Sequence, residues 1–318
     1  MAILNYNLST NLQGMLTEIS SLRSKLLLTP ISPAIEIRYR WEATLSKIYW
    51  SLTLSNSPLS KVDITKLIAY PTKKRLTEFQ KEAVEYKNAL DYIKQNWILS
   101  GKTVSLKTIR VLYDLALKPT LGPGLADLEK RGKEVERLLN YLQTGSENPI
   151  VAAGIAQIEF EFISPFKDKN ERMARLLSQL FLYKNGYDMR GMMIFEEFYR
   201  NDLIALRSAK ESILKSNNLT LWLEYFAYGI IVQLKRALET IEEQKFKTEL
   251  PSTYWKLNER QKSILNLMEN PEIKITNKDV QREFKISQIT ASRDLAKLTN
   301  LGLLLSHGKG RSVYYTRV

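Results

Sequence analysis

The stretch FISPFKDKNERMARLL, residues 162–177, has the pattern of a phosphate-handling loop that leads into a helix. A Pro-Phe turn precedes an acid, Asp168, and an amide, Asn170, and two arginines, Arg172 and Arg175, follow three residues apart. Arginines at this spacing share one helix face, and the free N–H groups at a helix N-terminus favour an anion. The stretch therefore predicts a phosphate-binding turn.

Three residues within the stretch differ from those that a catalytic phosphate-binding loop would carry. Ser164 stands where such a loop would carry a general base, and Lys169 and Glu171 stand where glycine would be expected. A serine hydroxyl does not accept a proton at neutral pH, and loss of a general base costs about 10²–10⁴-fold in rate. Glycine reaches positive φ and brings N–H groups against phosphate, whereas Lys169 and Glu171 add Cβ atoms and charge. We expect weakened nucleotide binding.

Composition excludes several kinds of site. The 318 residues include no cysteine and one histidine, His307, which excludes disulfides, thiolate nucleophiles and Cys/His zinc sites. A metal would need oxygen ligands, and we predict Mg²⁺ on Asp168 with substrate phosphates. No apolar run approaches the roughly 18 residues of a membrane helix, and the start of the chain lacks a signal-peptide pattern. We therefore expect a cytoplasmic protein with no membrane partner.

The fold class follows from apolar periodicity. Before residue 240, helical spacing predicts helices over 8–28, 36–54, 78–98, 105–117, 130–142, 149–162, 170–184 and 219–243, with Pro and Gly between them. Periodicity is lost near Pro251. The sequence predicts a mainly α protein with four parts: a helical N-terminal part (1–100), a core with the motif at 164–175 (101–245), a linker (246–254) and a small module (255–318).

The C-terminal module has the pattern of a winged helix-turn-helix. Asn258, Asn277 and Ser287 are placed to open three helices, because short polar side chains cap helix N-termini. Two strand-like runs then flank HGKGR, residues 307–311, whose glycines allow a tight turn. Three helices and a hairpin in this order predict a DNA-binding unit.

The third helix and the hairpin carry the predicted DNA contacts. Ala291, Leu295 and Leu298 share a face that we expect to pack inward. Residues 255–318 hold 12 Lys and Arg against 6 Asp and Glu, a net charge of +6 out of +13 for the chain. We expect duplex DNA as a partner and a homodimer as a plausible state. The predicted DNA-binding residues are Gln288, Thr290, Ser292, Arg293, Lys309 and Arg311.

Two resemblances to known families accompany these patterns. The run ISQITASRDLAKLTNLGLL resembles the recognition helix of bacterial winged-helix regulators, and KGRSVYY fits the wing of the same family. The opening stretch resembles the signature of the Fic family, whose usual form is H-P-F-x-D-G-N-G-R-x-x-R. The segments IAQIEFEFISPF and EAVEYKNALDYI resemble the helices that precede this signature in the family. The residues that match the signature in register are Pro165, Phe166, Asp168, Asn170, Arg172 and Arg175.

The Fic resemblance implies a role for each motif position. Fic enzymes transfer AMP from ATP to a protein hydroxyl, with the motif histidine as the base. The resemblance gives Asp168 the Mg²⁺ and gives Asn170, Arg172 and Arg175 the polyphosphate, with Lys169 beside them. Ser164 occupies the histidine position, so we predict no catalytic residue.

A helix further upstream resembles a second element of the family. Many Fic proteins carry an inhibitory helix of the pattern S-x-x-I-E-G, whose glutamate pairs with the second motif arginine. The run TLSKIYWSLTLS, residues 44–55, looks like that helix. Aligned with this pattern, Tyr49 and Trp50 occupy the Glu-Gly positions, and an alignment shifted by one residue stays open.

These patterns favour a degenerate Fic-type protein with a DNA-binding winged helix, which acts in regulation and has an impaired or repurposed pocket for ATP and Mg²⁺. Two alternatives stay open. One is a protein AMP transferase that uses another base; Glu159 and Glu161 are the candidates, although we expect both to be helix-surface charges. The other is a scaffold whose old active-site groove binds a peptide or another protein target.

Overall fold

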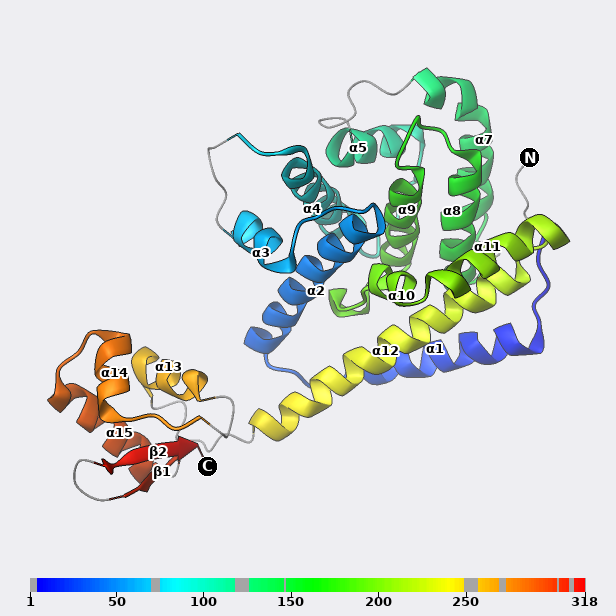
Figure 1. Cartoon of the computed structure of the whole chain (residues 1–318). Coiled ribbons are helices and arrows are strands. Elements are labelled where there is room, and N and C mark those ends of the chain that lie inside the picture. The colour runs from blue at the N-terminus through cyan, green and yellow to red at the C-terminus, as the bar shows by residue number, and fades with distance from the viewer. Residues whose placement is uncertain are drawn as a thin grey trace. The chain divides into compact units, whose positions relative to one another are not determined.

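The computed structural model describes residues 5–69, 75–117, 126–145, 147–248, 257–268, 273–301, 303–308 and 312–317. The fold is mainly α, as predicted, and the chain divides into two compact units, Met1–Glu243 and Gln244–Val318 (Figure 1). Within the described residues, no helix has both the length and the hydropathy that a bilayer crossing requires.

The first unit is a helical assembly around α8 and α9, which pack against each other (Figure 1). Its elements are α1 (Thr10–Leu28), α2 (Pro33–Leu54), α3 (Lys61–Ala69), α4 (Glu78–Asn96), α5 (Leu106–Ala116), α7 (Ala126–Leu142), α8 (Pro149–Ile163), α9 (Asn170–Lys184), the 3₁₀ turn η1 (Met189–Gly191), α10 (Phe195–Asn201), α11 (Leu203–Ser216) and α12 (Thr220–Thr248).

Side-chain caps fix the start of several of these helices. The Thr77 hydroxyl accepts a hydrogen bond from the backbone N–H of Gln80, whose side chain accepts in return from Thr77, so that α4 begins with a reciprocal capping box. The Asn148 side chain caps α8, and Pro149 follows it at the first helical position. Proline suits that position because its missing N–H would have no partner there.

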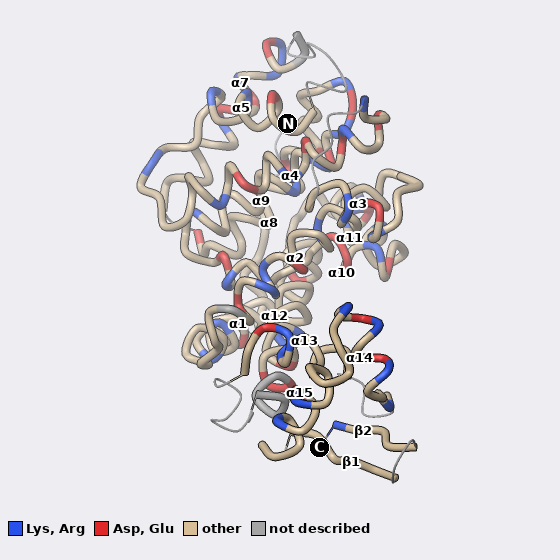
Figure 2. The backbone as a smooth tube through the Cα atoms, turned by 90° about the vertical axis from the view of Figure 1, so that its left-hand side faces the viewer, with Lys and Arg blue, Asp and Glu red and all other residues tan. Residues whose placement is uncertain are grey.

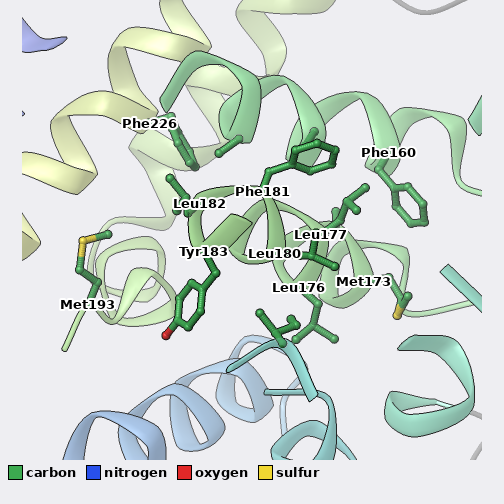
Figure 3. Packing of buried hydrophobic residues seen from close by; sticks show 14 of the residues in the cluster. Phe160, Met173, Leu176, Leu177, Leu180, Phe181, Leu182, Tyr183, Met193 and Phe226 are labelled. Carbon is green, nitrogen blue, oxygen red and sulfur yellow. The ribbon is translucent and has the colours of Figure 1, made fainter. Parts of the chain in front are cut away.

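The core surrounds α8, which is apolar on nearly all sides and buried from Ile150 to Phe160. Close approach of α12 depends on Gly154, where a Cβ atom would lie 2.8 Å from the Leu223 side chain. The carbonyl of this glycine accepts a hydrogen bond from the indole of Trp222 at 2.9 Å. Figure 3 shows the adjoining packing of Leu177, Leu180 and Phe181, on α9, with other buried residues of the cluster. This packing holds rigid the two helices that flank the motif.

Three helices of the first unit were not predicted from the apolar periodicity of the sequence. The predicted helices omit α3, α10 and α11, because these segments are short or half-exposed and present too few buried positions to give a helical pattern. In addition, α12 continues to Thr248, three residues into the predicted linker. Charged and polar residues such as those after Glu243 remove the amphipathic signal without opposing helix formation.

The second unit contains α13 (Glu259–Leu267), α14 (Asn277–Phe284), α15 (Gln288–Asn300) and the strands β1 (Leu304–His307) and β2 (Tyr314–Arg317). The strands are antiparallel, with Leu304 opposite Arg317 and His307 opposite Tyr314. Asn258 and Ser287 cap α13 and α15 as predicted, whereas the cap of α14 is Thr276 and Asn277 is its first helical residue.

A separate hydrophobic cluster supports the second unit. Ala291, Leu295 and Leu298 are fully buried on one face of α15, as the sequence predicts. On the same face lies a buried carboxylate, Asp294, which accepts hydrogen bonds from Arg260 at 2.6 Å and from Gln261 at 2.7 Å. These bonds tie α13 to α15.

Candidate functional site

The motif forms the turn between α8 and α9. Ser164 ends α8 in the left-handed conformation, with φ 49° and ψ 59°, and Lys169 precedes α9 in the same region, with φ 58° and ψ 27°. For residues other than glycine this conformation costs about 1–2 kcal/mol. The lysine thus adopts, at a cost in strain, a backbone conformation that glycine would adopt freely, and its Cβ atom does not prevent the turn.

Asn170 holds the loop together. Its side-chain oxygen accepts from the Phe166 N–H at 3.0 Å, and its amide nitrogen donates to the Phe166 carbonyl at 2.7 Å. The Phe166 ring is buried and stacks on Tyr113 with ring centroids 4.5 Å apart. Both ends of the Asn170 amide are therefore committed to the loop backbone.

Asp168 is exposed at the tip of the loop. One carboxylate oxygen accepts from the Lys169 backbone N–H at 2.7 Å. No group of three or more His, Asp or Glu side chains among the described residues could enclose a metal. Since Mg²⁺ is commonly held by one or two carboxylates and substrate phosphates, a single exposed carboxylate fits that ion only when a phosphate ligand completes its coordination. Asp168 would be its protein ligand.

The first motif arginine and the loop lysine share a carboxylate from α4. Glu82 accepts a hydrogen bond from Arg172 at 3.0 Å through one oxygen and forms an ion pair with Lys169 through the other. The Arg172 side chain is 1% exposed and Glu82 is also buried. A carboxylate of the chain itself therefore neutralises two of the cations predicted to bind phosphate.

The electrostatics of Glu82 reflect this arrangement. Burial alone would raise the pKa of the Glu82 carboxyl, but the hydrogen bonds and charges of Lys169 and Arg172 outweigh it and hold the pKa below its ordinary value. Glu82 is therefore a carboxylate anion at neutral pH, and the negative charge it supplies lies where a phosphate would interact with the same two cations.

The second motif arginine contacts the helix that resembles the inhibitory helix. Arg175 donates to the Ser51 hydroxyl at 3.2 Å, and Arg172 donates to the Ser55 hydroxyl at 3.3 Å. The residues of this segment that contact the two arginines are thus Ser51, in the last turn of α2, and Ser55, which follows its last residue. The residues assigned from the resemblance, Tyr49 and Trp50, are half-buried, and their rings pack edge to face at 4.7 Å.

Both arginines retain buried nitrogens without a hydrogen bond within the described part of the chain. These atoms are Nε and Nη1 of Arg172 and Nε of Arg175. Buried donors of this kind are costly, and an anion would satisfy them. Because they have no exposed surface, a phosphate would reach them only after the surrounding side chains move.

The expectation that Glu159 and Glu161 are surface charges is wrong for Glu159, which is 1% exposed. Glu161 is half-buried and accepts from the Lys210 ammonium at 2.5 Å. Burial raises the pKa of the Glu161 carboxyl, and Lys210 opposes that effect without cancelling it. Glu161 thus lies in the last turn of α8, three residues before Ser164, with the raised pKa that suits a proton acceptor.

In the second unit, α15 leaves Gln288, Ser292 and Arg293 exposed, whereas Thr290 is half-buried. The Ser292 hydroxyl accepts from Asn277 at 2.8 Å, so its side chain is already engaged by α14. Lys309 and Arg311 lie outside the described residues. Figure 2 shows basic residues on both α14 and α15.

Sequence reasoning missed the partners of the motif. Glu82 lies 87 residues before Lys169, and although it begins the segment EAVEYKNALDYI, no local feature of that segment identifies it as the partner of Lys169 and Arg172. Ser51 and Ser55 do carry a signal, since they are one turn apart within the segment that resembles the inhibitory helix.

These features define a helical protein with a cation-rich turn at a helix N-terminus, whose two arginines are buried. Residues 118–182 match the model of the Fic/DOC family, so the chain carries a Fic/DOC family domain that includes this turn.

Solved structures of Fic proteins share the fold. A Fic family protein from Desulfovibrio desulfuricans G20 is 17% identical with a TM-score of 0.68, and the match covers 99% of this chain and 98% of that one. Residues 134–508 of Fic-1 from C. elegans give 18% identity, a TM-score of 0.59 and 71% coverage of each chain. A Fic domain containing signaling protein from Bacteroides thetaiotaomicron VPI-5482 gives 19%, 0.59, and coverage of 74% and 97%.

Proposed function

We propose that this protein is a DNA-binding regulator built on a Fic-type core that does not transfer AMP. One arrangement carries the proposal. Ser164 stands in the histidine position, and Glu82 neutralises Lys169 and Arg172 where they would hold the nucleotide phosphates. The core lacks the base and holds its phosphate-binding groups in an internal network.

ATP with Mg²⁺ is the ligand proposed for the impaired pocket. Lys169, Arg172 and Arg175 would hold the phosphates and Asp168 the ion, while Asn170 holds the loop in shape. A phosphate and the Glu82 carboxylate compete for the same two cations. At about 4 Å and an effective dielectric near 20, two such negative charges repel by roughly 4 kcal/mol. ATP should therefore bind the native protein weakly.

The test is titration of ATP and Mg²⁺ into the native protein, Glu82→Gln and Glu78→Gln, followed by mass analysis of the recovered proteins. Glu78 is exposed in the first turn of the same helix and supplies the matched control. We expect Glu82→Gln to bind ATP at least about tenfold more tightly than the other two, which corresponds to about 1.4 kcal/mol. None of the three should gain the mass of AMP. Equal affinities would reject Glu82 as the competing group.

A second candidate function rests on Glu161. Its raised pKa and its place near Ser164 suit a substitute base for AMP transfer. An AMP adduct on the native protein in the same experiment would favour this function, and its loss in Glu161→Gln would assign the base.

The second unit is proposed to bind duplex DNA as a winged helix. The three helices, the antiparallel hairpin and the exposed Gln288 and Arg293 on α15 support this assignment. Arg293 would reach base edges, and the basic residues of the hairpin would contact phosphates.

We expect the full chain to bind duplex DNA with an affinity that falls steeply with salt, because phosphate contacts release counterions. Arg293→Ala should weaken binding to a selected operator by about 1–3 kcal/mol. Arg38→Ala, which removes a half-exposed arginine from the first unit, is the matched control and should have no such effect. A folded protein that shifts no duplex from a random pool at low salt would contradict the assignment.

A further inference from the structure

A cavity of about 50 Å³ lies between α2, α4, α9 and η1 in the first unit. It is lined from α9 by Gln179 and Tyr183, one and two turns beyond Arg175. It therefore lies further along α9 than the motif turn. Figure 3 shows the Tyr183 side chain pointing from α9 toward α2. A volume of this size exceeds the 10–15 Å³ or so that one water needs, and it accommodates a small polar group.

Lys47 is the decisive residue of the cavity. Its side chain comes from α2, is 7% exposed, and lines both this cavity and a smaller adjoining one that shares Gln179 and Tyr183. Among the described residues no carboxylate lies within ion-pair distance of its ammonium, which lies over the Tyr183 ring at 5.9 Å from the centroid. The Lys47 nitrogen is not among the fully buried polar atoms that lack a hydrogen bond in the described residues, so it keeps some exposed surface and an anion in the cavity can reach it.

The other charges of the lining are mostly committed. Arg40 and Arg190 share Glu36, at 2.5 Å and 3.6 Å, and Asp91 is paired with Lys87. Two further charged side chains of the lining form no ion pair or side-chain hydrogen bond within the described residues: Lys94, which is exposed, and Asp188, which is half-buried. The charged groups of the lining that have no ion-pair partner are thus two cations, Lys47 and Lys94, and one hydrogen-bond acceptor, Asp188.

We propose that this cavity is a binding site for a small organic oxyanion, separate from the motif. A phosphoryl or carboxylate group binds the Lys47 ammonium, with the amide of Gln179 as a further donor. Lys94 supplies a second cation from the exposed side. Asp188 requires a hydrogen-bond donor, so the ligand carries a hydroxyl or amino group near its anionic group. The apolar wall formed by Leu90 and Ile98 suits a short carbon skeleton.

Isothermal titration of the full chain with inorganic phosphate and with malate, at constant ionic strength, tests the site. We expect saturable binding of at least one probe. Binding of phosphate alone identifies a phosphorylated ligand, and binding of malate alone or of both identifies a carboxylate-accepting site. Lys47→Met should weaken binding on the order of tenfold or more, since hydrogen bonds to charged groups contribute about 1.5–3 kcal/mol.

Three further variants make the test specific. Lys107→Met removes an exposed lysine from α5 and should bind as the native protein does. Lys169→Gln, in the motif turn, detects binding of the probe at the motif instead, and it should weaken binding less than Lys47→Met does because Lys169 does not line the cavity. Lys47→Gln repeats the main test with a polar side chain in case Lys47→Met does not fold. No saturable binding, a loss in Lys47→Met that is no greater than in Lys107→Met, or an equal loss in Lys169→Gln would overturn the proposal.

Discussion

At the scale of the residue, Ser164 and Lys169 show that the backbone conformation of the motif turn does not depend on the residues that catalysis would require. Both take left-handed backbone conformations without glycine, so the turn keeps its path while Ser164 lacks a proton acceptor and Lys169 lies in an ion pair. Histidine is among the non-glycine residues enriched in positive-φ conformations, so position 164 can accept it without rebuilding the turn.

We therefore predict that Ser164→His folds with a melting temperature within a few degrees of the native value, yet transfers no AMP from ATP. The new base would lack a bound nucleotide, because Glu82 still neutralises Lys169 and Arg172. Mass analysis of the variant after incubation with ATP and Mg²⁺ measures the outcome. An AMP adduct formed by this single variant would mean that the ion-pair network does not block the pocket.

At the scale of the element, the Glu82 ion pairs join α4 to the start of α9. Arg172 is almost fully buried, and removal of its partner leaves an uncompensated charge in the interior. Breaking a buried pair in this way costs about 3–5 kcal/mol. The network therefore stabilises the first unit, and it also neutralises the cations that would bind a phosphate in the pocket.

This contribution should depend on pH. The folded-state pKa of Glu82 is lowered, so its stabilisation is present above the unfolded-state pKa and is lost as pH falls through the folded-state value. Glu82→Gln should lower the free energy of unfolding by about 3 kcal/mol at pH 7. The difference from the native protein should begin to shrink below the ordinary glutamate pKa of about 4.3 and should be lost only below the lowered folded-state value.

Denaturant unfolding of the native protein, Glu82→Gln and Glu78→Gln at pH 7 and at the lowest pH that preserves the fold measures this difference. Glu78→Gln should stay close to the native protein at both pH values. A destabilisation by Glu82→Gln that is as large at low pH as at pH 7 would show that the carboxylate charge is not its source.

Local patterns explain why some elements were predictable and others were not. The predicted helices correspond to segments in which buried residues recur at helical spacing, as in α5 with Ile109, Leu112 and Ala116 buried. Segments such as α11 bury a single residue fully, Ile213, and give no such pattern. The motif turn was readable because its residues are contiguous, whereas Glu82 and Lys47 reach their sites by tertiary packing.

At the scale of the whole molecule, two hydrophobic clusters support two units, one with the motif and one with the hairpin. The C-terminal elements lie in the order that the sequence predicts, because capping residues and the glycine-containing hairpin are local signals. Residues 255–318 carry +6 of the net charge of +13 in about a fifth of the chain, while in the first unit Lys169 and Arg172 form ion pairs with Glu82. The basic residues of the second unit are thus available to a polyanion, whereas these two cations of the motif are already neutralised.

The lysine in the motif turn also constrains how this sequence can evolve. A change of Lys169 to glycine would leave Glu82 with one cation fewer, and a change of Glu82 alone would leave Arg172 buried without its carboxylate. Each single substitution removes one partner from the ion-pair network. Substitutions that open the loop to a phosphate are therefore less costly to stability when they are made together than when they are made one at a time.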